Sequence, residues 1–191
     1  MSDIDALIQH WRAGDERAAE AIYNQYRGIT FGLAFALLGN SADAEEVTQD
    51  ALTYALTHIG QYKPQRAKFS TWLHTITVSR CRNKQRRRVL PGLALFAWLK
   101  QGGDIPDPTP GPENQILAGT IRTEVWQAIH SLKPALREAI VLRYWADYTY
   151  PEMAAILGCS ARVARSRVQT AHQQLEPILT QTGLVNIKET Y

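Results

Sequence analysis

The stretch LGCSARVARSRVQ, residues 157–169, places a short Gly-Cys-Ser turn directly before a segment that carries Arg162, Arg165 and Arg167. A turn of this length between two helical segments is typical of helix-turn-helix units, whose second helix enters the major groove of DNA. The alternative is an ordinary solvated helix near the end of a globular domain. The segment alone fits both interpretations, so the rest of the chain has to separate them.

Helical periodicity divides residues 161–176 into two faces. One stripe is apolar, which predicts packing against the preceding helices: Ala164, Val168, Ala171 and Leu175. The opposite face carries side chains that suit base edges and phosphates, because Arg pairs with guanine and Gln with adenine. This face consists of Arg162, Arg165, Ser166, Gln169 and Gln173. Arg167 lies towards the flank of the apolar stripe, where we expect it to reach a phosphate.

The residues before the turn supply a start signal for the first helix of this pair. Thr149 stands at an N-cap position with Glu152 three residues later, which predicts a capping box, and Pro151 is tolerated in a first helical turn. A short helix, the turn and a longer helix reproduce the helix-turn-helix layout. Together with the acid-free outer face, this layout favours groove binding over a merely solvated helix.

The whole chain predicts an all-α fold. It has no sustained apolar–polar alternation and no Asn-Gly or Asp-Gly hairpin signal, whereas helix signals recur along its 191 residues. Asp15 is placed as an N-cap, Gly39 as a helix end, and Asn40 or Ser41 as the next N-cap. That helix is expected to stop at Gly60. We therefore expect two small helical domains, at residues 1–88 and 116–185.

Residues 89–115 are predicted to form a flexible linker between these domains. Prolines at 106, 108, 110 and 112 exclude a helix there, and the surrounding Gly and Asp residues favour an extended chain. An apolar strip precedes the prolines and either packs on a domain, the preferred interpretation, or docks a partner: Leu93, Leu95, Phe96, Trp98 and Leu99.

The formal net charge of +3 conceals a strong asymmetry. Residues 1–50 hold nine of the 18 acidic residues against three arginines, and no acidic residue lies between Asp50 and Asp104. This asymmetry indicates one face for a polyanion and another for a basic protein partner, although a lone charged cluster is more often a solvated surface. The acid-free span holds ten basic residues: Lys63, Arg66, Lys68, Arg80, Arg82, Lys84, Arg86, Arg87, Arg88 and Lys100.

The sequence gives no signal for secretion, membrane insertion or metal binding. Its two most apolar runs, ITFGLAFALLG and VLPGLALFAWL, are shorter than the roughly 20 residues of a membrane span, so we expect a cytoplasmic protein without membrane insertion. Cys81 and Cys159 have no partners at metal-ligand spacing, and we expect no metal and no other cofactor. Arg80 and Arg82 could lower the pKa of Cys81, yet a reduced structural thiol is the preferred interpretation.

Three segments of the chain resemble the extracytoplasmic-function (ECF) sigma factors of bacterial RNA polymerase, a branch of the sigma-70 family. LKPALREAIVLRYWADYTYPEMAAILGCSARVARSRV, residues 132–168, is similar to their region 4. NSADAEEVTQDALTYAL, residues 40–56, and YKPQRAKFSTWLHTITVSRCRNKQRR, residues 62–87, are similar to their region 2. The order of these segments and the Pro-rich connection between them fit the two-domain branch, which lacks regions 1.1 and 3.

The resemblance implies partners for the acidic and C-terminal segments. The acidic segment matches the part of region 2 that docks on the clamp helices of the polymerase β′ subunit: Asp43, Glu46, Gln49 and Asp50, with Glu45 beside them. A carboxylate-rich helix face suits a basic partner, although these acids also complement the N-terminal dipole of their helix. Region 4 is implied to contact the polymerase β flap and the promoter −35 element, and an anti-sigma factor is a further partner that the resemblance allows.

The resemblance also implies that the segment from Gln61 to Arg88 opens and reads the promoter −10 element, with the loop up to Phe69 forming a pocket for a flipped base. Trp72 is expected in the core. Ser79 and Asn83 replace the Asn and Asp common in the family, and Gln169, Thr170 and His172 replace basic residues of region 4, so the preferred bases are left open. The implied −10 residues are Lys63, Arg66, Lys68, Phe69, Arg80, Asn83, Lys84, Arg86, Arg87 and Arg88.

The function predicted from these features is that of a sigma factor, which directs core RNA polymerase to promoters and has no enzymatic activity of its own. One alternative is a free-standing helix-turn-helix regulator that binds duplex DNA without polymerase. Another is a metal-dependent nucleotide hydrolase built on the carboxylates around Glu46. Such hydrolases present carboxylates from two facing helices, and the sequence offers no second acidic helix.

Overall fold

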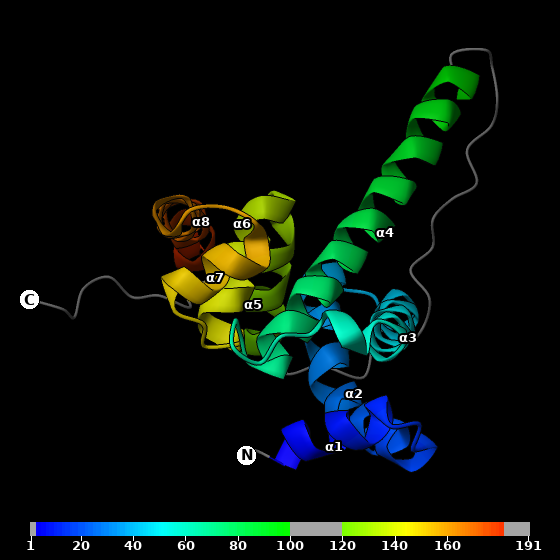
Figure 1. Cartoon of the computed structure of the whole chain (residues 1–191). Helices are drawn as coiled ribbons and strands as arrows, with labels where there is room; N and C mark the ends of the chain where they lie inside the picture. The colour runs from blue at the N-terminus through cyan, green and yellow to red at the C-terminus, as the bar shows by residue number, and fades with distance from the viewer. Residues whose placement is uncertain (1–2, 100–119, 182–191) are drawn as a thin grey trace, which may run out of the picture.

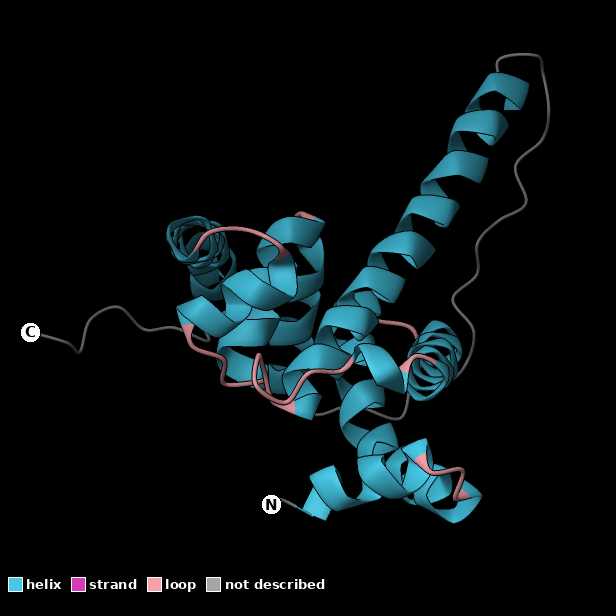
Figure 2. Cartoon of the chain, in the orientation of Figure 1, coloured by secondary structure: helices cyan, strands magenta, loops and turns pink. Residues whose placement is uncertain are grey.

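The computed structural model describes residues 3–99 and 120–181, and this part of the chain is helical without a strand (Figure 2). This confirms the all-α fold. The first half contains α1 (Asp3–Arg12), α2 (Glu16–Leu38), α3 (Ser41–Thr57), the 3₁₀ turn η1 (Ile59–Gln61) and α4 (Phe69–Leu99). The second half contains α5 (Thr120–Ser131), α6 (Pro134–Ile140), its π-helical continuation η3 (Val141–Trp145), α7 (Tyr150–Leu157) and α8 (Ala161–Gln181).

The helix ends in the first half are set by the residues that the sequence marks for them. Asp15 accepts a hydrogen bond from the backbone N–H of Arg17 at 3.0 Å and caps α2. Gly39 ends α2 with a φ of 69°, a left-handed conformation that glycine adopts without a Cβ clash. Asn40, rather than Ser41, caps α3 by accepting from the N–H of Asp43 at 2.9 Å. The sharp corner between α2 and α3 follows from this pair.

Helix α4 is longer than the sequence predicts. The linker was expected to begin at residue 89, but α4 continues through Pro91 to Leu99 and extends beyond the rest of the molecule (Figure 1). A proline inside a helix removes one hydrogen bond and crowds the carbonyl of the preceding turn, but this cost is local, and the Leu and Ala residues after Pro91 favour continuation of the helix. The side chains of the apolar strip 93–99 and residues 100–119, with the four prolines, lie outside the described part.

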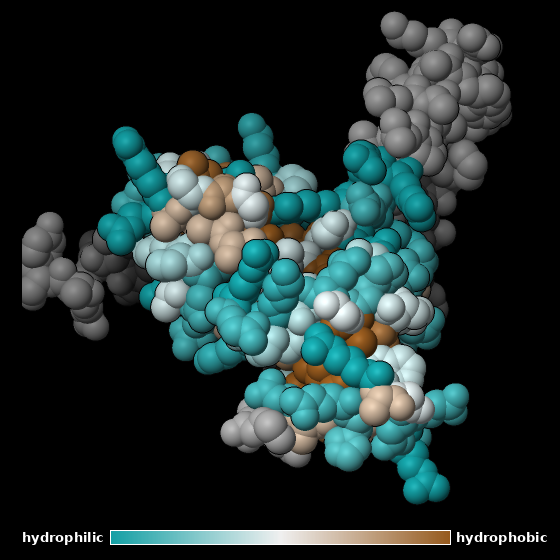
Figure 3. Space-filling model, in the orientation of Figure 1, coloured by the Kyte–Doolittle hydropathy of each residue, from teal (hydrophilic) through white to brown (hydrophobic). Residues whose placement is uncertain are grey.

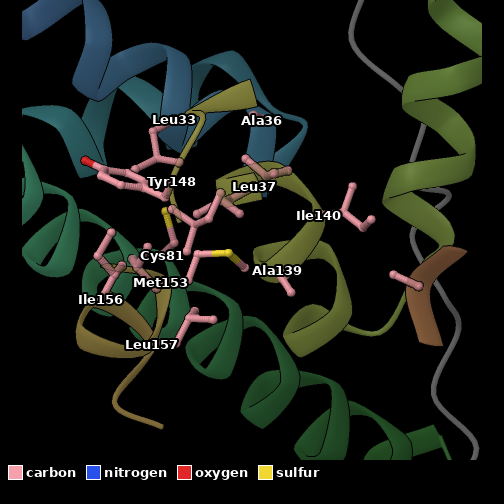
Figure 4. Close-up of a cluster of buried hydrophobic side chains, with 14 of the residues drawn as sticks. Leu33, Ala36, Leu37, Cys81, Ala139, Ile140, Tyr148, Met153, Ile156 and Leu157 are labelled. Atoms are coloured by element: carbon pink, nitrogen blue, oxygen red, sulfur yellow. The ribbon is translucent and has the colours of Figure 1, made fainter. Parts of the chain in front are cut away.

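Two hydrophobic cores hold the helices together. The smaller core lies within the first half, where Ile22 of α2, Leu52 of α3 and Leu73 of α4 are fully buried. The larger core includes residues of both halves: Leu33 and Leu37 of α2 and Cys81 of α4 pack with Met153 and Leu157 of α7 (Figure 4). The two predicted domains therefore share a core in this structure, an arrangement that the sequence does not predict.

Polar contacts also cross between the halves. The Arg82 guanidinium on α4 donates to both carboxylate oxygens of Glu138 on α6, at 2.8 and 2.7 Å. The Tyr148 hydroxyl, before α7, lies 2.8 Å from Nδ1 of His74 on α4. Because the His74 Nε2 is buried without a hydrogen-bond partner, this contact satisfies only one of the two ring nitrogens.

The burial of His74 predicts a loss of stability in acid. Burial lowers the pKa of His74 from 6.5 to about 4, so the packed state binds fewer protons than the unfolded chain below pH 6.5. The free energy of unfolding should therefore fall as the pH drops from 6.5 to 4, by on the order of 2–3 kcal/mol from this group. Urea unfolding across this range measures the effect. His74→Gln should show a shallower pH dependence, whereas the exposed His172→Gln should follow the wild type; parallel curves for all three would contradict it.

Candidate functional site

Helix α8 presents the two faces that its periodicity predicts. Its apolar stripe, Ala164, Val168, Ala171 and Leu175, is buried against the preceding helices of its half. Arg167 is half-buried at the flank of this stripe, as expected. The predicted DNA-facing residues are all exposed: Arg162, Arg165, Ser166, Gln169 and Gln173.

Local hydrogen bonds and one left-handed glycine define the start of α7, the turn after it and the start of α8. Glu152 accepts from the N–H of Thr149 at 2.9 Å and from its hydroxyl at 2.6 Å, which confirms the capping box. These bonds hold the pKa of Glu152 below its usual value. Gly158 ends α7 in a left-handed conformation with a φ of 67°, and the Ser160 hydroxyl accepts from the N–H of Val163 at 3.3 Å to begin α8. The result is a helix-turn-helix unit.

Tyr150 organises the arginines beside this unit, a role that the sequence analysis missed. The guanidinium of Arg165 lies 5.0 Å from the centre of the Tyr150 ring, and that of Arg143 lies 5.5 Å from it. Both are cation–π distances. The ring thus restrains Arg165 on the exposed face of α8, within the first turns of the helix. Sequence spacing gives no signal for this contact, because Tyr150 precedes Arg165 by fifteen residues across a turn.

The loop between η1 and α4 carries three of the predicted basic residues, and two aromatic residues hold its ends. Lys63, Arg66 and Lys68 are exposed. Tyr62 and Phe69 anchor the two ends of the loop, with their ring centres 5.4 Å apart. Phe69, one of the implied −10 residues, is only 2 % exposed, and its ring packs in the core because a bare phenyl gains most by burial. Trp72 packs against the same core, as predicted.

The basic face of α4 lies along the solvent-facing side of that helix. Arg86 and Arg87 are exposed, and Arg86 donates to the side-chain oxygen of Asn83 at 3.2 Å. The Arg80 guanidinium lies 4.7 Å from the ring centre of Tyr54 on α3, which fixes its direction. The side chain of Arg88 lies outside the described part.

Lys84 is the exception among the predicted basic residues. Its ammonium group forms ion pairs with Glu46 and, at 3.5 Å, with Asp43, both on α3. These partners raise the pKa of Lys84 and lower that of Glu46. Asp43 is buried at 7 % exposure instead of lying on the surface, because its side chain points towards α4 from the first turn of α3. Lys84 and Asp43 thus join two helices rather than face outward.

The remaining acidic residues lie on the open side of α3. Glu46, Gln49 and Asp50 are exposed. A shallow hollow between α3 and α4 brings the acidic and basic surfaces together, and its lining is Glu46, Val47, Asp50, Arg80, Asn83, Lys84 and Arg87. Polar residues cover most of the face seen in Figure 3, and apolar residues show mainly in recesses between helices.

Each half of the chain matches a known protein family. The family described as Sigma-70 region 2 matches residues 22–89, and the family described as Sigma-70, region 4 matches residues 122–175. Helices α2–α4 and α5–α8 are the parts that carry these matches. The chain is an ECF sigma factor. It therefore contains region 2, with the basic loop and the acidic face, and region 4, with the helix-turn-helix unit.

Individual relatives of this sigma factor agree. The ECF RNA polymerase sigma factor SigE of Mycolicibacterium smegmatis is 31% identical over 87% of the chain, which spans 64% of that longer relative. The sigma-H factor of Pseudomonas aeruginosa is 27% identical over 91% of the chain and 92% of its own length. Among solved structures, the sigma factor CnrH, in complex with the cytosolic domain of CnrY, covers 94% of the chain and 99% of its own, with 23% identity and a TM-score of 0.63, which supports the fold.

The two cysteines of the sigma factor are free, and Cys81 is buried, in agreement with the preferred interpretation of a reduced structural thiol. Arg80 and Arg82 do not lower the pKa of Cys81; burial raises it to about 12, with Glu138 adding to the effect. The Arg82 guanidinium instead forms an ion pair with Glu138 at 2.7 Å. In the described residues no group of His, Cys, Asp or Glu side chains is arranged to hold a metal, and no helix there is long and apolar enough to span a membrane.

Proposed function

We propose that this sigma factor binds core RNA polymerase through the open side of α3 and contacts a promoter through two separate surfaces. The observation that supports the proposal is that exposed acidic and exposed basic side chains lie next to each other on region 2. Glu46, Gln49 and Asp50 face solvent on α3, while Arg86 and Arg87 face solvent on α4. Region 2 thus has two adjacent surfaces of opposite charge. The acidic surface suits a basic protein partner, and the basic surface suits a polyanion.

The acidic residues suit the clamp helices of the polymerase β′ subunit. Lys84 neutralises part of the charge of Glu46, which leaves Gln49 and Asp50 as the fully available contacts. We assign Asp43 a supporting role, because its carboxylate is buried and shares Lys84 with Glu46. Region 4 contacts the β flap, and the polymerase carries out the chemistry while the sigma factor contributes binding and strand separation.

The −10 element is contacted by the basic loop and by α4. The loop residues Lys63, Arg66 and Lys68 are displayed above the Tyr62–Phe69 pair, which suits a strand whose bases are unstacked. Phe69 acts here by fixing the loop, and Lys84 by fixing α3 against α4. The residues left to contact the strand on α4 are Arg80, Asn83, Arg86, Arg87 and Arg88.

The −35 element is contacted by α8, whose exposed face is supported by the buried stripe and by Tyr150. Arg162 and Arg165 lie in the first turns of the helix, where a recognition helix enters the groove most deeply. Ser166, Gln169 and Gln173 continue the same face, and Arg167 reaches a phosphate. An anti-sigma factor is a further partner, supported by solved relatives whose complexes contain one, among them the sigma factor RpoE of Bartonella quintana with NepR.

A free-standing helix-turn-helix regulator explains less of the chain. Such a regulator has no use for a region 2 that matches the sigma-70 family over residues 22–89. Multi-round transcription with purified core polymerase on a promoter library tests the proposal directly. Transcription that starts at a defined set of promoters only when this chain is added supports it, and duplex binding without any stimulation of polymerase would contradict it.

The polymerase interface predicts a charge-reversal phenotype. Glu46→Lys together with Asp50→Lys should weaken binding to core polymerase by on the order of 100-fold or more, because like charges then meet across the interface. Co-purification and a quantitative titration measure this. Glu16→Lys with Glu20→Lys makes the same charge change on exposed positions of α2 and should bind normally. Undiminished binding of the α3 variant, with its helix content intact, would remove this interface.

The basic end of α4 predicts a melting phenotype. Neutralising Arg86, Arg87 and Arg88 to Gln should reduce open-complex formation, and the slope of log affinity against log salt should fall by about 2 because up to three single-strand phosphates lose a partner. Permanganate footprinting of −10 thymines measures the opening. Neutralising the exposed Arg17 and Lys133, which lie outside α4, is the control. Equal thymine reactivity with the wild type, the α4 variant and the control would contradict a melting role and indicate that these arginines are only solvated surface residues.

The exposed face of α8 predicts a change in base preference. If Arg165 pairs with a guanine, Arg165→Ala should cost about 1–3 kcal/mol at the −35 element and relax preference at one position. Arg167→Ala, which removes a phosphate contact, should weaken binding evenly across sequences. A −35 library scored with both variants separates the two effects. An unchanged preference profile for Arg165→Ala, with lower affinity, would assign base reading to Gln169 instead.

A further inference from the structure

Helix α1 ends against the segment that leads into the basic loop between η1 and α4. The last residue of α1, Arg12, donates through Nη2 to the backbone carbonyl oxygen of Ile59 at 2.8 Å and to that of Tyr62 at 3.0 Å. Ile59 begins the 3₁₀ turn η1, and Tyr62 follows it directly. One nitrogen of Arg12 therefore bonds to both ends of η1, at the point where the chain enters the loop.

A second side chain of α1 makes a similar contact earlier along the chain. The indole N–H of Trp11 donates to the carbonyl oxygen of Leu56, in the last turn of α3, at 2.9 Å. Ile8 of α1 is buried at 3% exposure in the smaller core, which also contains Tyr62 and Phe69. Helix α1 thus packs on the core that holds both ends of the loop and also bonds to the backbone that leads into it.

The basic loop is closed within itself and at its far end. The N–H of Arg66 donates to the carbonyl oxygen of Lys63 at 3.0 Å, which forms a four-residue turn with Pro64 at its second position. The carbonyl oxygen of Lys68 accepts from the N–H of Trp72 at 3.1 Å, in the first turn of α4. Because the turn and the exit are fixed in this way, the position of the loop depends on how its entry is held.

Arg12 holds this entry without being part of the core. The residue is exposed, although its two hydrogen bonds to the carbonyl oxygens are partly buried. Hydrogen bonds from a charged donor are stronger than those between neutral groups, so a single guanidinium is an effective restraint on a short segment. Removal of an exposed side chain leaves no cavity, so the loss of Arg12 should release the loop entry and leave the helix packing in place.

The position of the loop matters because its ligand is itself mobile. A single strand with unstacked bases has to be ordered when it binds, and any protein segment that is ordered at the same time adds to that cost. The exposed cations Lys63, Arg66 and Lys68 lie within six consecutive residues. A displacement of the loop entry therefore moves all three together, whereas a held entry keeps them in place before the strand arrives.

We propose that α1 is a positioning element for the −10 contact and that Arg12 acts by holding the entry of the basic loop. The proposal rests on the proposed function of that loop. It gives a role to a helix that precedes the region 2 match, which begins at residue 22. Arg12 acts through the loop and not on the strand. Its loss therefore weakens −10 binding and leaves the binding of core polymerase and of the −35 element unchanged.

Hydrogen exchange of the full chain measures the positioning itself. Arg12→Gln replaces the guanidinium by a shorter, neutral side chain and should speed exchange at the N–H groups of residues 61–68, while α2 and α3 exchange as in the wild type. Arg17→Gln is the matched control, because it makes the same change on an exposed residue of α2. Unchanged exchange in the loop, or faster exchange throughout region 2, would overturn the proposal.

Binding of the holoenzyme to a single-stranded oligonucleotide measures the consequence. The oligonucleotide carries a −10 sequence selected from the promoter library. Arg12→Gln should weaken its binding by about tenfold, because the loop then has to be ordered during binding, and core polymerase affinity should stay within about twofold of the wild type. Arg17→Gln should match the wild type in both assays. Normal oligonucleotide binding by Arg12→Gln would contradict the positioning role.

A double-mutant cycle separates positioning from direct contact with DNA. The loop variant replaces Lys63, Arg66 and Lys68 by Gln. In this background Arg12→Gln should weaken oligonucleotide binding by less than about twofold, since no loop cation is left to position. A full tenfold loss there would show that Arg12 contacts the strand itself, which overturns the proposal.

The same cycle distinguishes failure of the proposal from failure of the proposed function. A loop variant that binds the oligonucleotide like the wild type would contradict the −10 role of the loop, and the positioning role would fall with it. A defective loop variant beside a normal Arg12→Gln would contradict only the role of α1.

Discussion

The arrangement of the two regions depends on the burial of one carboxylate. Glu138 lies on α6 at an apolar contact, where an ionised group without a partner is strongly unfavourable. Arg82 is the only basic side chain that the described residues pair with it. Cys81, Met153 and Leu157 belong to the core that both regions share, and the bidentate pair joins α4 to α6 in a fixed orientation. That dependence makes the interface specific in position and sensitive to single substitutions.

Helix α4 uses different faces for different contacts. Its buried face supports both hydrophobic cores through Leu73 and Cys81, a second face pairs with α3 through Lys84, and a third exposes Arg86 and Arg87. Because consecutive residues of a helix point about 100° apart, neighbours in sequence serve different surfaces. The run from Arg80 to Arg87 therefore looks like a uniform basic segment in the sequence but divides into inward and outward groups in the structure.

The sequence predicts local features well and contacts between distant segments poorly. The capping box at Thr149, the left-handed Gly39 and the two faces of α8 follow from neighbours within a few turns, where residue type and period determine the outcome. The burial of Asp43 and the close approach of Trp145 to Gly32 depend on which helices meet, and spacing contains no information about that. The sequence also predicts too short an α4, which continues to Leu99. The effect of Pro91 on the backbone is local, so the residues that follow it can still be helical.

The aromatic pair beneath the basic loop has an evolutionary consequence. Tyr62 and Phe69 supply the burial that holds the loop ends, while the residues between them contribute little to the core. Substitutions at Lys63, Arg66 or Lys68 therefore leave folding nearly unaffected while they alter what the loop contacts. Duplicated copies of such a gene can diverge in promoter choice by drift in a few exposed positions, without passing through unstable intermediates.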